Sequence, residues 1–198
     1  LISPKRSDKR IESIFFSGIE TLPSSSGYDF IEDPDELEKL FILQKYIFPK
    51  DYTPKYPERV ELQNYIKNIN EKNTTFLRSP FDAKRAVRKY FKDLNLPSST
   101  VSVSLRDYDF MPKRNSNNDE WLKFCKTLEK KKFKILILPD NDGDTVCEEF
   151  SSLESVFVVP DYFLDAAHRL AIYESCMINL NVNNGPSALC WLCPQVNY

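Results

Sequence analysis

Residues 177–191, Met-Ile-Asn-Leu-Asn-Val-Asn-Asn-Gly-Pro-Ser-Ala-Leu-Cys-Trp, decide the predicted fold. Apolar residues alternate with Asn over 177–182, which is typical of a β-strand. Gly185 suits a tight turn through a close backbone approach or a positive φ, and Pro186 suits the start of a helix, where its missing N–H needs no partner. The stretch therefore predicts a strand, a turn and a helix that begins at Ser187.

The same alternation of strand and helix runs back along the chain. We expect further elements in this order: a strand at 100–105, a helix at 119–128, strands at 133–138 and 155–159, and a helix at 162–176. The run 133–138 is almost continuously apolar, as in a parallel sheet that is covered on both faces. The pattern predicts an α/β fold with a doubly wound, Rossmann-like parallel sheet over residues 96–198, truncated at its C-terminus.

Residues 1–95 follow a different pattern, and we expect them to form a helical and loop-rich segment. Gly, Pro and Ser residues divide its beginning into loops. Helices are expected from Asp33, over 57–69 and from Ser79 to Phe91. The last of these helices has a basic face, which is either solvated or a binding surface.

Composition limits the class of protein. The chain has 198 residues, of which 41% are hydrophobic and 13% aromatic, enough for a packed core. Its formal net charge of -2 lacks the basic excess that nucleic-acid binding usually requires, so we expect no nucleic-acid partner. No apolar run reaches the roughly 18 residues of a membrane span, so no transmembrane segment is expected. Because the chain begins with Leu1 rather than Met, we expect a fragment of a longer protein.

Two motifs have the spacing of metal or redox sites. Cys190 and Cys193 are spaced like a redox or zinc pair, but no second pair or His cluster accompanies them, so we expect reduced cysteines in the core. Residues 139–144 carry three acids, which line a ligand, bind a divalent ion or are merely solvated. A strand rather than a helix precedes them, unlike a calcium-binding loop, and we expect no metal.

Ligands of parallel sheets bind beyond the carboxyl ends of the strands. Four segments should meet at that edge: the loops after Leu105, Leu138 and Val159, and the turn at 183–187. By itself this turn fits a plain helix start as well as an anion site, in which the N–H groups of 187–189 would point at the ligand.

Arg106 directly follows the first strand and favours the anion site, because a guanidinium binds phosphate through two parallel hydrogen bonds. The alternative is a surface pair with Asp107 or Asp109. Lys113 and Arg114 in the next loop are weaker candidates for the same role.

The helix expected at 162–176 carries two polar candidates. His168 is the only imidazole, so any histidine acid–base chemistry in this chain must use it. Glu174 could face a sugar or a ribose. Both residues also fit structural roles, as a packed histidine and as a solvated charge at a helix end.

The stretch from 96 to 194 resembles the C-terminal, donor-binding domain of glycosyltransferases with two Rossmann domains (GT-B), most closely the heptosyltransferase and bacterial surface-polysaccharide families. The residues that carry the resemblance are 101–106, 121–122, 134–138, 169–176 and 183–189. Asn-Asn-Gly-Pro stands where Asp-Ser/Thr-Gly-Pro is more usual. Residues 1–95 would then be a remnant of the acceptor side or a linker.

The resemblance also implies a set of binding residues. The donor diphosphate would contact Arg106, Asn184, Gly185, Pro186 and Ser187. The loops on the nucleoside side would include Pro139, Asp140, Asn141, Phe163 and Leu164. His168 and Glu174 would be candidate contacts to the sugar or ribose, and no catalytic base is nominated because it normally comes from the N-terminal half.

The expected function is transfer of a sugar from a nucleotide-diphosphate sugar to a glycan or lipid-linked acceptor, as in polysaccharide biosynthesis. The nucleotide-sugar is a substrate, and no cofactor or metal is expected. We expect a cytoplasmic location, either free or peripheral to the membrane. The alternatives are a non-catalytic nucleotide-sugar-binding or scaffold module, and a nucleotide-sugar 2-epimerase that would depend on His168.

Overall fold

The computed structural model describes Thr21 and residues 77–108, 111–139 and 149–198, which we call the described residues. They all belong to one compact unit. The two helices expected before residue 70 lie outside them, as does most of the acidic loop at 139–144, so those predictions stay predictions.

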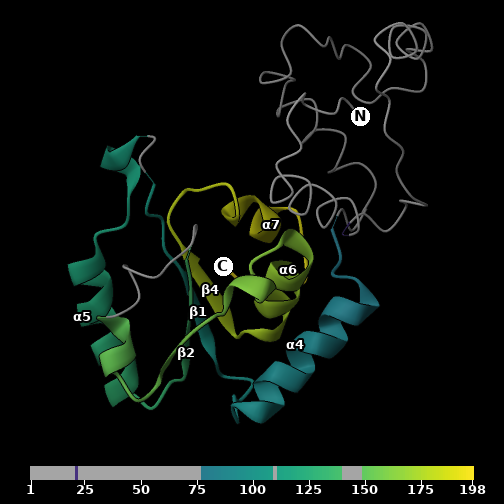
Figure 1. The fold of residues 1–198 in the computed structure, drawn as a ribbon, viewed down its shortest axis with the longest axis horizontal. Coiled ribbons are helices and arrows are strands. Elements are labelled where there is room, and N and C mark those ends of the chain that lie inside the picture. Colours follow the sequence, from purple (N-terminus) through teal and green to yellow (C-terminus); the bar gives the residue numbers. More distant parts are fainter. Residues whose placement is uncertain (1–20, 22–76, 109–110, 140–148) are drawn as a thin grey trace, which may run out of the picture. The chain divides into compact units, whose positions relative to one another are not determined.

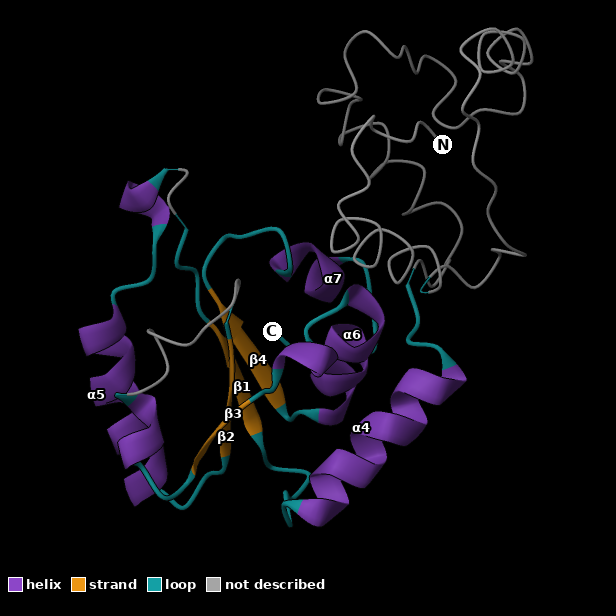
Figure 2. Ribbon diagram, viewed as in Figure 1, coloured by secondary structure: helices purple, strands orange, loops and turns teal. Residues whose placement is uncertain are grey.

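Four parallel strands form the centre of the described residues. They are β1 (Val101–Ser104), β2 (Ile135–Leu138), β3 (Val156–Val158) and β4 (Ile178–Asn181). Their order across the sheet is β3-β2-β1-β4, and Val101 of β1 pairs with Ile135 on one side and with Ile178 on the other. Helices flank this sheet (Figure 1; Figure 2), so the predicted α/β class with a parallel sheet is confirmed.

The connections leave β1 in two directions. Helix α5 (Asn118–Lys130) leads from β1 to β2, and the chain passes on to β3. Helix α6 (Ala166–Ser175) then returns the chain across the sheet to β4, on the other side of β1. Figure 1 shows α5 on one face of the sheet, and α6 with α4 (Phe81–Asp93) on the other. The direction of winding reverses between β1 and β4, and we call their carboxyl ends, with residues 105–116 and 182–187, the switch point.

The continuous apolar run of β2 is explained by cover on both faces. Ile135 and Ile137 belong to a cluster that includes Cys125 of α5. Leu136 and Leu138 belong to a second cluster with residues of α4 and α6. All four side chains of β2 are fully buried, as expected for a central parallel strand.

Polar side chains link β1, β4 and α6 inside the second cluster. Ser102 Oγ donates to Asn179 Oδ1 at 2.5 Å, and Asn179 Nδ2 donates to the carbonyl of Tyr173 at 3.0 Å. The hydroxyls of Ser104 and Tyr173 are 2.7 Å apart. Buried polar groups are costly without partners, so these bonds make polar residues acceptable in the sheet. We call these four residues the buried polar network.

Two helices, α5 and α6, begin at capping side chains. Asn117 Oδ1 accepts from the backbone N–H of Glu120 at the start of α5. Asp165 Oδ1 accepts from the N–H of His168 at the start of α6, so this helix begins at Ala166 and the prediction that it begins at Tyr162 is wrong. Residues 161–163 form a separate 3-10 turn. No helix among the described residues is both long enough and apolar enough to cross a bilayer.

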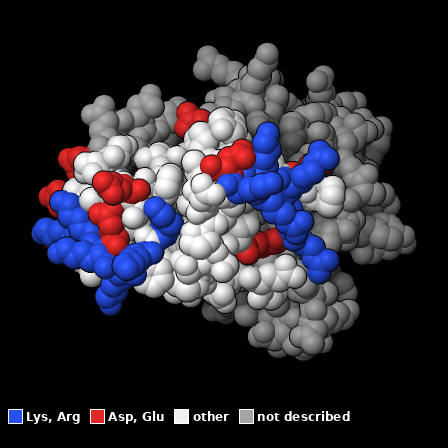
Figure 3. Space-filling model, turned by 90° about the horizontal axis from the view of Figure 1, so that it is seen from below, with Lys and Arg blue, Asp and Glu red and all other residues white. Residues whose placement is uncertain are grey.

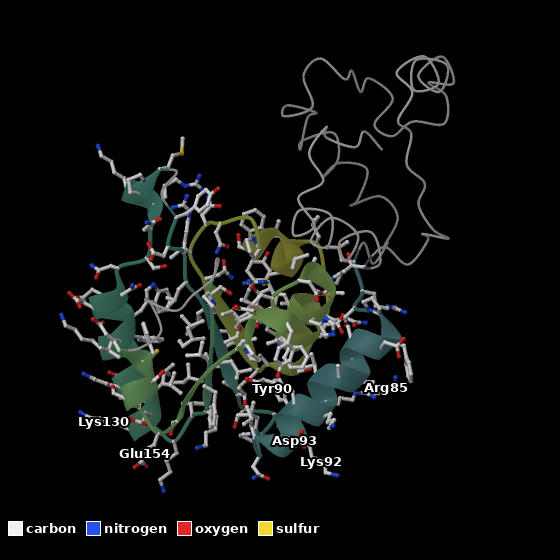
Figure 4. The ribbon with its side chains drawn as sticks, in the orientation of Figure 1. Arg85, Tyr90, Lys92, Asp93, Lys130 and Glu154 are labelled. Carbon is white, nitrogen blue, oxygen red and sulfur yellow. The ribbon has the colours of Figure 1, made fainter. Side chains whose placement is uncertain are left out.

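Basic side chains gather at the edge opposite the switch point. Figure 4 places Lys92, Asp93, Lys130 and Glu154 along the lower side of the view. These residues come shortly before β1, β2 or β3, so the strands begin on that side. Figure 3, seen from below, shows Lys and Arg side chains in two separate groups there. Lys92, near the end of α4, lies on this side of the sheet.

Replacing Phe150 by Ala tests the cluster between the sheet and α5. Phe150 is fully buried, so the substitution should lower the free energy of unfolding by about 3–5 kcal/mol, measured by urea denaturation. The matched control is Phe81→Ala at a residue that is 73% exposed, which should change it by no more than about 0.5 kcal/mol. Equal losses in the two variants would contradict this packing.

Candidate functional site

An arginine joins the two segments of the switch point. Arg114 ends the 3-10 helix Pro112–Arg114 in the loop after β1. Its Nη2 donates to the carbonyl oxygen of Asn183, in the turn after β4, at 2.9 Å. The hydrogen bond crosses from one strand end to the neighbouring one, so the loop and the turn named from the sequence do lie together.

Arg106 is buried and organises the loop after β1. Arg106 is only 5% exposed. Its Nη1 donates to the carbonyl of Met111 at 3.2 Å and to Asn115 Oδ1. The guanidinium lies 5.8 Å from the ring centroid of Tyr108, a cation–π distance. The backbone of Arg106 exchanges hydrogen bonds with Ser116. These contacts hold the guanidinium within its own loop, which is one of the two segments of the switch point.

The loop also contains a strained residue. Met111 has φ 57° and ψ 63°, the left-handed conformation, which a residue with a Cβ adopts at a cost of roughly 1–2 kcal/mol. Its carbonyl accepts hydrogen bonds from Arg106 Nη1 and from the N–H of Arg114. Both arginines therefore depend on this conformation for their position, and such strain is typical of functional loops.

The turn at 183–187 is an internally bonded helix start. Asn184 Oδ1 accepts from the N–H of Ser187 at 3.0 Å, and Ser187 Oγ donates to the carbonyl of Asn184 at 2.6 Å. The N–H groups of Ala188 and Leu189 donate to the carbonyls of Gly185 and Pro186. The expectation that the N–H groups of 187–189 point at a ligand is therefore not met, because each already has a partner inside the turn.

Two other properties of this turn bear on ligand access. Gly185 does not have a left-handed φ, and a Cβ placed on it would meet nothing within 4 Å. The predicted positive φ is therefore wrong, whereas a close approach of a ligand to this backbone stays a prediction, since the space beside Gly185 is open. Asn184 is 6% exposed, and its Nδ2 has no hydrogen-bond partner in the described structure. Within this turn, the hydrogen-bond donor without a partner is therefore Asn184 Nδ2 and not a backbone N–H of the helix.

The residues expected on the nucleoside side are divided. Pro139 follows β2 and is buried, whereas Asp140 and Asn141 lie outside the described residues. Phe163 and Leu164 follow β3, at the same edge of the sheet. The ring of Phe163 is 4.9 Å from that of Tyr90 on α4, and burial raises the pKa of Tyr90 to about 12. The side chain of Phe163 thus packs in the core, and only its backbone lies at the edge formed by the carboxyl ends of the strands.

His168 pairs with the residue that caps its own helix. Its Nδ1 is 2.6 Å from Asp165 Oδ2, and its ring centroid is 5.2 Å from that of Phe163. The imidazole and the N–H of His168 therefore both contact Asp165, as in a side chain that fixes the first turn of a helix. These contacts agree with the structural alternative stated for the sequence, a packed histidine.

Glu174 joins α6 to residues that are far away in the sequence. Its carboxylate accepts from the N–H and hydroxyl of Ser79 at 3.1 and 2.6 Å, and is 2.8 Å from Lys84 Nζ. Glu174 is close to the end of α6, and the next strand begins at the edge opposite the switch point. The structure does not bring Glu174 together with Arg106 and the turn.

Glu174→Gln tests whether Glu174 stabilises the fold or contacts a ligand. Loss of the ion pair to Lys84 should lower the free energy of unfolding by about 1–3 kcal/mol, measured by thermal or urea denaturation, since the carboxylate is largely buried. The dissociation constant for any nucleoside diphosphate that the protein binds should stay unchanged. Glu154→Gln, at an exposed position, is the matched control and should alter neither quantity. A weaker ligand affinity in Glu174→Gln without loss of stability would restore Glu174 as a ligand contact.

Sequence reasoning missed Arg169. This residue is 3% exposed on α6, and it donates from Nη2 to the carbonyl of Pro139 at 2.8 Å and from Nε to that of Leu164 at 3.3 Å. A signal was present, because Arg169 is the only Lys or Arg after Lys134 and stands among apolar residues of a helix. Its partners lie in separate loops, which periodicity does not reveal.

The cysteine pair is buried and reduced. Cys190 and Cys193 are free thiols, each 1% exposed. Burial raises the pKa of Cys190 to about 12 and also raises that of Cys193. A neutral thiol is a poor nucleophile and metal ligand. Among the described residues no group of three His, Cys, Asp or Glu side chains could hold a metal ion.

Thiol labelling tests this arrangement. Burial raises the pKa of Cys125 to about 11 and that of Cys176 to about 12, so these thiols and Cys190 stay neutral and protected at pH 8 in the folded protein. A Cys147→Ser variant should therefore react slowly with an aromatic disulfide reagent until it is unfolded in guanidinium.

The same thiols give an expected pH dependence. Unfolded thiols ionise near their ordinary pKa of 9.0, whereas Cys176 and Cys190 ionise at about 12 in the fold. Their contribution to stability is complete below pH 9 and is lost as the pH rises toward 12. Rapid labelling of the folded protein at pH 8 would contradict the burial of these thiols.

Comparison with known proteins gives fold-level similarity only. No family model matches the chain, and no curated protein matches it at a significant level. A glycosyl transferase family 9 structure from Veillonella parvula is similar with a TM-score of 0.49 and 10% identity, over 57% of this chain and 33% of that chain. The structure of POFUT1 in complex with GDP is similar with a TM-score of 0.44 and 14% identity, over 58% of this chain and 43% of that chain. The chain thus spans less than half the length of either protein.

Proposed function

We propose that residues 96–198 bind the diphosphate of a nucleotide-sugar at the switch point, as the donor-binding part of a GT-B-type glycosyltransferase. The observation that carries the proposal is the Arg114–Asn183 hydrogen bond, which brings the arginine-bearing loop after β1 against the turn after β4. The sugar would pass to a glycan or lipid-linked acceptor. The resemblance noted in the sequence supports this class of reaction.

The charges at the switch point suit a diphosphate. Arg106 and Arg114 both lie in the loop after β1, with Lys113 exposed between them. Guanidinium groups are well matched to phosphate oxygens, and they are strongest where they are already held in place. Here the contacts to Met111 and Asn115 hold Arg106, and the open space beside Gly185 gives a ligand room.

The same groups would assist the reaction. When the sugar leaves, negative charge grows on the departing nucleoside diphosphate, and positioned guanidinium groups stabilise that charge. A base that activates the acceptor is not among the residues assigned here. A non-catalytic binding module would use the same diphosphate site, and donor binding without transfer or hydrolysis of the sugar would identify it.

Calorimetry with UDP, GDP and ADP tests the proposal. Arg114→Ala should weaken binding of the best of these ligands by about 10- to 100-fold, since hydrogen bonds to charged groups contribute roughly 1.5–3 kcal/mol. Arg106→Lys should also weaken it, because lysine keeps the charge but loses the planar fork.

Arg88→Ala, at an exposed arginine on α4, is the matched control and should bind as the wild type does. If the wild type binds none of the three nucleotides, or if both switch-point variants keep its affinity, the chain has no donor site at this position.

A further inference from the structure

Arg169 is a buried cation without a visible anionic partner. It is 3% exposed, and none of the ion pairs found among the described residues involves it. Removing a guanidinium from water is costly, and an apolar residue of similar size is often the more stable choice at such a position. A buried arginine therefore calls for a specific role.

Its hydrogen bonds join two loops of the sheet edge. Nη2 donates to the carbonyl of Pro139, the residue directly after β2, and Nε donates to the carbonyl of Leu164, after β3. The guanidinium is rigid and planar, so these two carbonyls are kept at a fixed separation and orientation. One side chain thus fixes the backbone of Pro139 relative to that of Leu164.

The third guanidinium nitrogen, Nη1, does not take part in these hydrogen bonds. Nη1 is buried and has no hydrogen-bond partner in the described structure. Burial raises the pKa of Tyr173, four positions further along α6, and the positive charge of Arg169 lowers it. The hydroxyl of Tyr173 is 2.7 Å from that of Ser104 at the end of β1. The hydrogen bonds of Arg169 run to residues that follow β2 and β3, and not to the segments of the switch point.

We propose that Arg169 is a positioning residue for the nucleoside part of the ligand. The proposal rests on the proposed function, which assigns the diphosphate to Arg106 and Arg114, and on the resemblance noted in the sequence, which implies that Pro139 and Leu164 lie on the nucleoside side. Arg169 acts through the carbonyls of these two residues: it fixes the distance between them and so the width of the sheet edge that would receive the base and ribose. The diphosphate contacts do not depend on it.

This assignment separates the two halves of the ligand in an experiment. Calorimetry is done on the full chain with inorganic pyrophosphate and with the nucleoside diphosphate, among UDP, GDP and ADP, that the wild type binds most tightly. Arg169→Met removes the charge and both hydrogen bonds at similar volume. Arg169→Lys keeps the charge but can reach only one carbonyl.

Both variants should bind the nucleoside diphosphate about tenfold or more weakly, the size seen when a residue that orients a binding group is lost, and should bind pyrophosphate as the wild type does. Wild-type affinity in Arg169→Lys would show that charge, not positioning, matters. An equal loss for pyrophosphate would make Arg169 a phosphate ligand. Each of these results overturns the proposal.

Stability needs its own control, because Arg169 is buried. Glu174→Gln changes the same helix at a distance from the edge and should lower the melting temperature without altering either affinity. If the Arg169 variants lose stability but keep the wild-type ratio of the two affinities, the residue is only structural and the inference fails. If the wild type binds pyrophosphate and nucleoside diphosphate not at all, the proposed function itself fails.

Discussion

The buried polar network fixes β4 beside β1 and so places the two segments of the switch point. Ser102 on β1 and Asn179 on β4 bond each other across the sheet, and Tyr173 of α6 bonds both strands from above. These groups have no access to water, so a different pairing of β4 would leave several donors and acceptors without partners. Apolar packing alone would tolerate β4 at other places. The hydrogen bonds specify its place beside β1, and this creates the switch point.

The arginines of the sheet edge have separate tasks because their surroundings differ. Arg114 is exposed and reaches across the switch point to Asn183. Arg106 is buried in the loop after β1 and supports the strained Met111. Arg169 is buried on α6 and joins the backbone of Pro139, after β2, to that of Leu164, after β3. Arg106 thus stabilises the loop after β1, Arg114 joins this loop to the turn after β4, and Arg169 links the residues that follow β2 and β3.

The sequence predicted the sheet well because its signals are local. The alternating residues of β1 and β4 and the apolar run of β2 are found within a few positions of the observed strands. The start of α6 was missed, since the capping bonds of Asp165 outweigh the helical periodicity of the residues before it. Contacts over long sequence distances were also beyond the pattern. Ser79 and Glu174 are 95 positions apart, and Arg169 is 30 positions from Pro139.

The site shows the same division between local and distant information. The loop after β1 and the turn at 183–187 lie at one edge as predicted, joined by the Arg114–Asn183 hydrogen bond, because parallel strands bring their carboxyl ends together. The use of the N–H groups of the turn was not correctly foreseen, since the side chain of Asn184 competes for Ser187. Asparagine side chains often accept hydrogen bonds from backbone N–H groups a few positions further along the chain, and Asn184 does so here.

The loop after β1 carries most of the information for its own shape. The contacts described for Arg106 run to Tyr108, Met111, Asn115 and Ser116, all within ten positions. Asn115 also bonds Asp107 and the backbone of Tyr108. These contacts close over a short stretch of the chain, so a peptide that spans residues 105–116 already contains every partner named here.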